Sequence, residues 1–231
     1  MRYRHLFFDL DHTLWDFDTN ARLTLIQLYH DLGLEKEGVH DFDLFYQSYL
    51  FHNEKLWSRF RNGFIKADDL RWKRMWHALL EFKIGDEKLA RVMGTKFLEL
   101  LPTRNLLFPD AIDTLQYLQD KGYNMHLITN GFEEIQHKKL KNSGISGFFI
   151  EVITSEGSNS IKPKKEIFEF ALKKAAALHH QSIMIGDSIE LDIQGAINAG
   201  IDQVYMNHPG AACSIRSTYI VGSLKELQDI F

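Results

Sequence analysis

The sequence lacks several features that would point to particular classes of protein. Cys213 is the only cysteine among 231 residues, so we expect neither a disulfide framework nor a thiolate metal cluster. There is no block of lysine and arginine, and the formal net charge is −4, which argues against binding to a nucleic-acid polymer. No run approaches the roughly 18 uninterrupted apolar residues of a membrane helix, and no secretory signal pattern is present. We therefore expect a cytoplasmic protein that does not associate with membranes.

The composition that remains is that of a soluble globular protein. Hydrophobic residues make up 45% of the chain and charged residues 25%, which is enough to build a sizeable core. The length suits one α/β domain, or one domain that carries a smaller insertion. We find no internal repeat and no low-complexity segment.

The spacing of apolar residues divides the chain into two kinds of segment. Residues 5–10 form a short apolar run, which predicts a buried strand. For about eighty residues after Asp18, apolar residues recur at steps of three and four, which is typical of amphipathic helices. Beyond Pro109 helices alternate with strands. We expect strands at 123–129, 149–154, 182–185, 203–206 and 219–221, and helices at 109–122, 133–143, 164–178, 189–199 and from 223 onward.

This alternation predicts an α/β fold with a doubly wound, mainly parallel, Rossmann-like sheet. The helical block is then an insertion after the first strand. We expect a core domain made of residues 1–15 and 106–231, and a helical cap domain made of residues 16–105.

Polar and charged residues follow several of the predicted strands directly. In doubly wound folds the ligand binds beyond the carboxyl ends of the strands, so these residues are the candidates for a site. They are Asp9, Asp11, Thr13, Thr129, Asn130 and Asp187. Asp192 follows a few residues after Asp187, and Lys162 precedes the helix that comes after the strand at 149–154. We expect their carboxylates, hydroxyls and ammonium group to converge on one edge of the sheet.

This set of groups suits phosphoryl transfer. A carboxylate can attack phosphorus to form an aspartyl-phosphate, which water then hydrolyses. Attack on a phosphate dianion needs a cation, and clustered carboxylate oxygens are ligands that suit Mg²⁺. A second carboxylic acid can protonate the leaving oxygen and later accept a proton from water. A lysine and a hydroxyl can balance the charge on the other phosphoryl oxygens.

Four short motifs in the chain resemble those of a known protein family. They are Asp-Leu-Asp-His-Thr at 9–13, Leu-Ile-Thr-Asn at 127–130, Lys162-Pro163, and Gly186-Asp187 with Asp192. In these motifs the sequence resembles the haloacid dehalogenase superfamily, and specifically its phosphatases with a helical cap inserted after the first motif. The motifs occur in the required order over residues 7–200, so the resemblance covers nearly the whole chain.

The resemblance implies roles for the acidic residues. Asp9 would be the nucleophile and Asp11 the general acid and base. Mg²⁺ would bind the Asp9 carboxylate, the Asp11 backbone carbonyl and Asp187. Asp192 would support the metal or its water ligands.

The resemblance also implies how the phosphate is held. Thr129 and the Asn130 amide would bind phosphate, and Lys162 would bridge Asp9 and the phosphate. The segment Leu14-Trp15-Asp16-Phe17 is most similar to the branch of pyrimidine 5′-nucleotidases. The favoured substrate is therefore a small phosphorylated metabolite of the nucleoside 5′-monophosphate class.

Each of these residues also has a simpler explanation. Asp9 and Asp11 could end a strand and begin a turn, and Asp187 and Asp192 could stabilise a helix N-terminus. Thr129 and Asn130 could belong to an ordinary turn, and Lys162, before a proline, could be a solvated surface residue. The aromatic residues between 42 and 60 are better explained as core packing than as a stacking platform for bases. Trp15 and Phe17 fit either a contact with the leaving group of the substrate or a packing role beside the catalytic loop.

Other functions remain compatible with the same fold. A phosphatase or mutase for a sugar phosphate or phosphoglycolate would use the same four motifs. A 2-haloacid dehalogenase displaces halide from carbon, so Asp11 and Asp187 would both be surplus to it. A non-catalytic sensor of phosphorylated metabolites is disfavoured because every motif position is filled.

Overall fold

The computed structural model describes residues 2–208 and 216–231, and Cys213 lies outside this part of the chain. The chain divides into two compact units. We call Met1–Phe17 together with Asn105–Phe231 the core unit, and Asp18–Arg104 the helical unit. Among the described residues, no helix is both long enough and apolar enough to cross a membrane.

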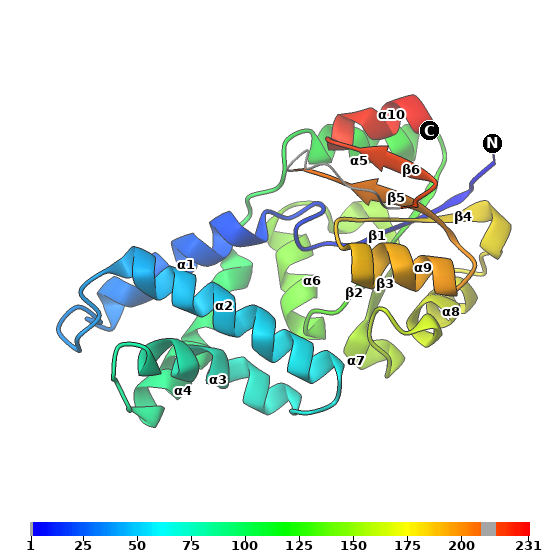
Figure 1. Ribbon diagram of the computed structural model, residues 1–231. Helices are drawn as coiled ribbons and strands as arrows, with labels where there is room; N and C mark the ends of the chain where they lie inside the picture. Colours follow the sequence, from blue (N-terminus) through cyan, green and yellow to red (C-terminus); the bar gives the residue numbers. More distant parts are fainter. Residues whose placement is uncertain (1, 209–215) are drawn as a thin grey trace. The chain divides into compact units, whose positions relative to one another are not determined.

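The core unit is built on a parallel sheet, which has six strands in the described part of the chain (Figure 1). They are β1 (His5–Phe8), β2 (Asn124–Thr129), β3 (Phe149–Thr154), β4 (Ser182–Gly186), β5 (Asp202–Met206) and β6 (Tyr219–Val221). The strand order is β3-β2-β1-β4-β5-β6, which reverses direction beside β1, where ligands bind in such folds. Phe8 lies opposite Leu127 and Ile185, so β1, β2 and β4 end at the same edge. The predicted doubly wound sheet is confirmed.

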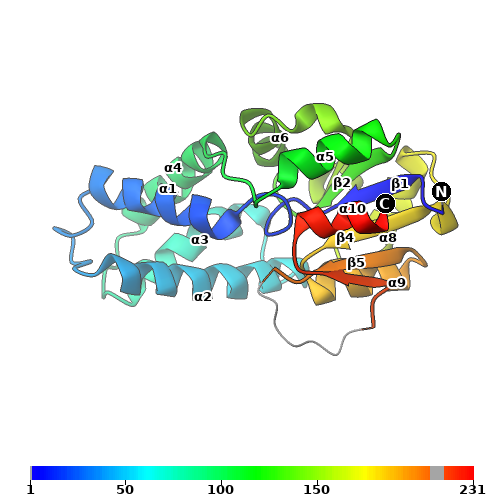
Figure 2. The same cartoon turned by 90° about the horizontal axis from the view of Figure 1, so that it is seen from above.

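Helices cover both faces of this sheet (Figure 2). Phe7, Ile128 and Met184 point to one face, where they form a buried cluster with Phe168 and Ala196 from the following helices. The helices of the core unit are α5 (Ala111–Asp120), α6 (Glu133–Asn142), α7 (Ser155–Ser158), α8 (Lys165–Lys174), α9 (Gly195–Asn198) and α10 (Leu227–Ile230). Short 3₁₀ turns lie at η2 (Ser146–Phe148), η3 (His179–Gln181) and η5 (Leu224–Glu226).

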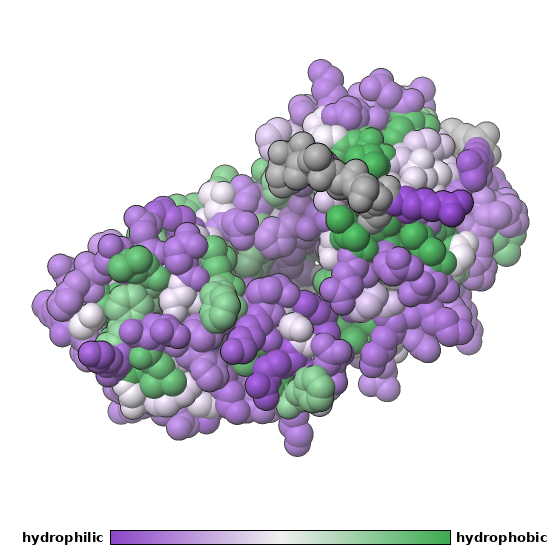
Figure 3. Space-filling view, viewed as in Figure 1, coloured by the Kyte–Doolittle hydropathy of each residue, from purple (hydrophilic) through white to green (hydrophobic). Residues whose placement is uncertain are grey.

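The helical unit contains only helices and loops, as the spacing of its apolar residues predicted. Its elements are α1 (Phe17–Asp31, whose first residue belongs to the core unit), α2 (Phe42–Arg61), α3 (Ala67–Leu80), α4 (Glu87–Leu100) and the 3₁₀ turn η1 (Leu101–Thr103). Asp41 and Asp86 cap α2 and α4 by accepting backbone N–H bonds of 3.0 Å. Phe45 and Tyr49 are fully buried inside the unit together with Phe97 of α4, which confirms the predicted packing role for these two residues of the stretch 42–60. On the face of the molecule seen in Figure 3, most residues are hydrophilic.

Three helices differ by more than two residues from their predicted extents. The helix predicted from residue 223 onward is the 3₁₀ turn η5 followed by α10. The segment predicted as one helix at 189–199 is a π-helix, η4 (Ile189–Gln194), followed by α9. The Ser188 carbonyl accepts N–H bonds from both Asp192 and Ile193, which makes the turn wider than an α-helical turn. The helix predicted to reach residue 178 ends with α8 at Lys174. It ends there because Ala176 adopts a positive φ of 49°.

Candidate active site

The loop after β1 turns sharply and keeps its side chains at the sheet edge. The Leu10 carbonyl accepts N–H bonds of 2.9 Å from both Leu14 and Trp15, so the chain reverses within a few residues. His12 has a positive φ of 62°, an uncommon conformation for a residue with a side chain, and one that tight turns use. The loop therefore presents the two carboxylates of Asp9 and Asp11 close to the ends of β1 and β4.

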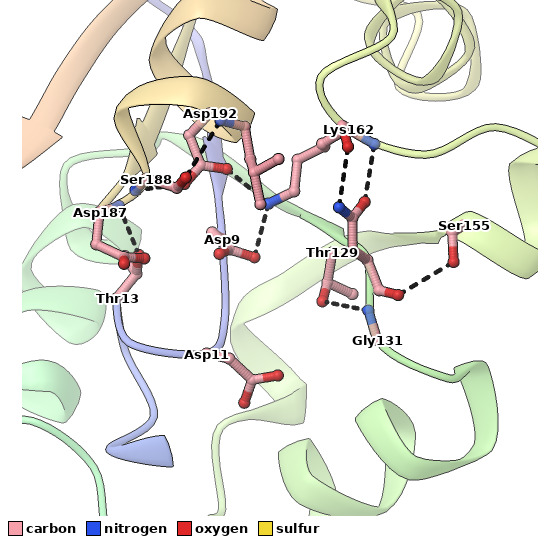
Figure 4. A network of polar contacts seen from close by, with 12 residues as sticks. Asp9, Asp11, Thr13, Thr129, Gly131, Ser155, Lys162, Asp187, Ser188 and Asp192 are labelled. Atoms are coloured by element: carbon pink, nitrogen blue, oxygen red, sulfur yellow. Dashed lines mark hydrogen bonds and ion pairs between the residues drawn. The ribbon is translucent and has the colours of Figure 1, made fainter. Parts of the chain in front are cut away.

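A buried lysine links Asp9 to a second carboxylate (Figure 4). Lys162 Nζ lies 2.8 Å from Asp9 Oδ1 and 2.6 Å from Asp192 Oδ1. The side chain of Lys162 is 2% exposed, that of Asp9 13% and that of Asp192 0%. The Ser188 N–H donates to Asp192 Oδ2 at 3.0 Å, so both oxygens of Asp192 are engaged. Asp192 thus holds the ammonium group against Asp9.

The loops after β1 and β4 are joined through Thr13 and Asp187. Thr13 Oγ1 donates to Asp187 Oδ1 at 3.0 Å and accepts the Asp187 N–H at 3.1 Å. Thr13 is fully buried, so the two bonds are shielded from water. This reciprocal pair fixes the Asp187 carboxylate beside the loop that follows β1.

The electrostatics of the site are dominated by burial of negative charge. Burial raises the pKa of Asp9 to about 7, although Lys162 opposes the shift. Burial, together with the Asp9 carboxylate, raises the pKa of Asp187 to about 6, and burial also raises the pKa of Asp192. Burial alone would lower the pKa of Lys162, but the Asp192 and Asp9 carboxylates outweigh it and raise that pKa. Asp9 and Asp192 therefore share the ammonium group of Lys162, and the carboxylate of Asp187 lies close to both.

This donor set fits a divalent cation. Asp9, Asp187 and Asp192 each place a carboxylate oxygen within 4.8 Å of the others. Asp192 already binds Lys162 and Ser188, so Asp9 and Asp187 are the carboxylates better placed to serve as ligands. All the donors are oxygens, which suits Mg²⁺, and a cation would offset the excess of carboxylates over ammonium groups.

Thr129 and Asn130 lie at the end of β2, as predicted, and Asn130 has a specific structural contact. Its side-chain Nδ2 donates to the Lys162 carbonyl at 3.1 Å, and its Oδ1 accepts the Lys162 N–H at 2.8 Å. The Asn130 side chain therefore fixes the backbone at Lys162 (Figure 4). The Thr129 hydroxyl accepts bonds from the Gly131 N–H at 3.2 Å and from Gln136 Nε2 at 2.6 Å. Its own proton is then available to donate to a ligand.

Two residues at the site were not identified from the sequence, and both contact Asp11. Lys139 Nζ lies 2.6 Å from Asp11 Oδ1, and Gln136 Nε2 donates to Asp11 Oδ2 at 3.0 Å. Both come from α6 and are buried. A signal was present in the sequence, because they fall four and seven positions after the buried Phe132, on the inward face of the helix. Polar residues on such a face need a partner.

A sheet edge with this set of carboxylates, hydroxyls and lysine defines a hydrolase of the haloacid dehalogenase type. The family model described as haloacid dehalogenase-like hydrolase matches residues 3–200, and the chain belongs to this family. The resemblance inferred from the four motifs is thereby confirmed.

The relatives indicate the phosphatase branch of the family. The chain is 33% identical to the pyrimidine 5′-nucleotidase PynA of Streptococcus pneumoniae, over 99% of this chain and 95% of that protein. It is 29% identical to the pyrimidine 5′-nucleotidase YjjG of Escherichia coli, over 100% and 98% of the two chains. The crystal structure of the putative HAD-hydrolase YfnB from Bacillus subtilis bound to magnesium matches with a TM-score of 0.89 and 30% identity. That match covers 100% of this chain and 99% of the other.

Proposed function

We propose that the protein is a Mg²⁺-dependent phosphomonoesterase in which Asp9 is the covalent nucleophile. The observation that carries this proposal is the contact of Asp9 with the buried Lys162, 2.8 Å away, beside a second carboxylate, Asp187. A carboxylate held by an ammonium group in a dry site is oriented for attack and can meet an anionic phosphoryl group.

The reaction would run in two steps. A carboxylate oxygen of Asp9 bonds to phosphorus as the bond from phosphorus to the leaving oxygen breaks, and Asp11 gives its proton to that oxygen. A water molecule then attacks the aspartyl-phosphate. Asp11 takes a proton from this water, which releases inorganic phosphate and restores Asp9.

The remaining residues would bind the cation and the phosphoryl group. Asp9, Asp187 and the backbone carbonyl of Asp11 would hold Mg²⁺, with Asp192 in a supporting position. When bound, the ion supplies positive charge that lowers the repulsion between Asp9 and the phosphate dianion. Positive charge at this place also favours the ionised form of Asp9, against the effect of burial.

Phosphate binding would fall to the residues at the ends of β2 and the loop before α8. Thr129 would donate its hydroxyl proton to a phosphoryl oxygen, and the Asn130 amide would lie beside it. Lys162 would contact both the phosphoryl oxygens and Asp9. We further propose that the helical unit acts as a cap that excludes bulk water from the site.

The favoured substrate is a nucleoside 5′-monophosphate. The support is that PynA and YjjG, both similar over nearly their full length, are pyrimidine 5′-nucleotidases. A sugar phosphate or phosphoglycolate uses the same phosphoryl chemistry and is the alternative. Dehalogenation is disfavoured, because displacement of halide from carbon uses neither an acid at Asp11 nor a cation at Asp187.

The experiment is phosphate release from a panel of pyrimidine and purine monophosphates, sugar phosphates and phosphoglycolate, with and without chelator. We expect Asp9→Asn to lower turnover at least about 10³-fold, while Asp120→Asn, an exposed acid on α5, serves as the control. Full activity of Asp9→Asn would refute the nucleophile, and activity that survives EDTA would refute the metal. Isomerisation of a sugar 1-phosphate would identify a mutase.

A further inference from the structure

Lys139 is a buried cation that none of the four motifs includes. Its side chain on α6 is 2% exposed, whereas Lys138 and Lys141 on the same helix are exposed. Burial of an ammonium group is costly unless a partner compensates for the lost hydration. The partner of Lys139 therefore indicates what this residue does.

That partner is Asp11, the proposed general acid and base. Lys139 Nζ binds one carboxylate oxygen at 2.6 Å, and Gln136 Nε2 binds the other at 3.0 Å. Gln136 and Lys139 are three residues apart in a helix, so they lie on the same face of α6. The direction of the Asp11 carboxylate is thus set by a rigid helix as well as by the loop that carries the residue.

Aromatic rings enclose the other side of the same ammonium group. Lys139 Nζ lies 4.2 Å from the centroid of the Trp15 ring and 5.4 Å from that of Phe17, distances at which cation–π attraction acts. Trp15 is fully buried, and its Nε1 donates to Ser143 Oγ at 3.2 Å, just beyond the end of α6. These contacts leave the Lys139 ammonium little freedom to move away from Asp11.

We propose that Lys139, assisted by Gln136, is a positioning residue that holds the Asp11 carboxyl group in the orientation needed for proton transfer. This inference rests on the proposed function, because it assigns a role toward the leaving group that Asp11 protonates. A general acid must lie within hydrogen-bond reach of the leaving oxygen, and a displacement of about 1 Å can cost about 10² in rate. Two contacts, one at each oxygen, oppose such a displacement of the Asp11 carboxyl group. Each oxygen has a second lone pair, so the proton to be transferred can sit beside these contacts.

The experiment compares leaving groups in Lys139→Met. Methionine keeps an apolar stem against Trp15 and Phe17 and removes the ammonium group. We expect kcat/KM to fall about 10²-fold for a nucleoside 5′-monophosphate, whose alkoxide needs a proton. For p-nitrophenyl phosphate, whose leaving group needs little protonation, it should fall less than about 10-fold. The control is Lys138→Met, the adjacent exposed lysine paired with Glu134, which should leave both values unchanged.

A purely structural role predicts a different pattern. If Lys139 only stabilised the fold, both substrates would lose the same factor, and this result would overturn the proposal. The double variant Lys139→Met/Asp11→Asn gives a second criterion. We expect it to be no slower than Asp11→Asn alone, because the two residues act through one group, whereas fully additive losses would contradict the proposal.

Two further variants separate a loss of folding from a loss of positioning at Asp11. If Lys139→Met fails to fold by circular dichroism, Gln136→Leu removes the bond to the other oxygen of Asp11 and also the bond to the Thr129 hydroxyl. The loss through Thr129 should be common to both substrates, and the loss through Asp11 should add a further factor for the nucleotide. Equal losses for both substrates in that variant would overturn the proposal. The failure of the proposed function and the failure of the inference about Lys139 can be told apart. An active Asp9→Asn variant would refute the proposed function. An inactive Asp9→Asn variant, together with a Lys139 variant that shows no dependence on the leaving group, would refute only the inference about Lys139.

Discussion

The ammonium group of Lys162 compensates two buried carboxylates at once, and its removal should be costly. Lys162→Met preserves the length and apolar character of the side chain but removes the charge. Among the residues that the structure describes, the fully buried Asp192 carboxylate then keeps only the Ser188 N–H as a donor, and Asp9 loses its contact at 2.8 Å. A buried carboxylate without a cation takes up a proton instead of staying ionised.

The size of the effect follows from the free energy needed to keep that proton bound to the carboxylate. The ordinary pKa of an aspartate carboxyl group is 3.8. Keeping one protonated at pH 7.5 costs at most about 1.4 × (7.5 − 3.8), or about 5 kcal/mol. Breaking a buried ion pair costs about 3–5 kcal/mol, which agrees with this limit. We expect Lys162→Met to lower the unfolding free energy of the metal-free protein by about 3–5 kcal/mol at pH 7.5.

The loss should shrink as the pH falls. In the folded variant the pKa of Asp192 is raised above its unfolded value, so the folded state holds a proton that the unfolded chain releases. Each unit of pH between the two pKa values then changes stability by about 1.4 kcal/mol, with greater stability at lower pH. At pH 5.5 we expect a loss about 2–3 kcal/mol smaller than at pH 7.5. The assay is urea unfolding followed by circular dichroism, in the presence of chelator.

The matched control is a double-mutant cycle with Asp192→Asn. On the Lys162→Met background this change removes the unpaired charge and should recover about 2 kcal/mol or more, while activity stays lost. On the wild-type background it should destabilise, because Lys162 then keeps only Asp9 as an anionic partner. The reasoning is refuted if Lys162→Met costs less than about 1 kcal/mol at both pH values. It is also refuted if Asp192→Asn has the same effect on both backgrounds.

Two further predictions concern stability in the core unit. A Cβ atom at Gly186 would overlap the Asp192 carboxylate, so Gly186→Ala should lower the free energy of unfolding by about 1–3 kcal/mol. Gly147 has open space around it, so Gly147→Ala is the control and should leave that free energy unchanged. Equal losses in the two variants would contradict this prediction. Burial lowers the pKa of His126 from 6.5 to about 4, so the stability that neutral His126 contributes is present above pH 6.5 and is lost as the pH falls toward 4. The difference in unfolding free energy between wild type and His126→Leu should therefore change by about 2 kcal/mol between pH 7 and pH 5, and a constant difference would exclude this assignment.

The sheet and the convergence of the acids could be predicted because both follow from short-range patterns. Continuous apolar runs predict buried parallel strands. The residues after such strands meet at one edge of the sheet, independently of the length and conformation of the loops. Asp9, Thr129 and Asp187 come from three separate strands, and their meeting required only that topology. Lys162 was assigned through the family motif, because a lysine before a proline is by itself better explained as an exposed surface residue.

The contacts inside the site could not be predicted, because they depend on which side chain turns inward. Lys138 and Lys139 are adjacent and chemically identical, and only the rotation of α6 decides which one is buried. Asp192 was weighed as a favourable charge near a helix N-terminus. In the structure Ser188 provides the cap by accepting the Leu191 N–H, and Asp192 instead turns inside a π-helical turn to bind Lys162. Such a turn has no reliable sequence signal.

The two lysines give the adjacent acids Asp9 and Asp11 different electrostatic environments. Lys162 is shared between Asp9 and Asp192, and Asp187 lies close by, so the surroundings of Asp9 keep an excess of negative charge that a cation would offset. Lys139 makes its ion pair with Asp11, whose side chain is 23% exposed and is held by α6. Enzymes obtain two roles from two carboxylates by placing them in unlike environments. This difference supports Asp9, beside the proposed cation site, as the nucleophile. It supports Asp11, which pairs with Lys139, as the group that exchanges protons with the leaving oxygen and with water.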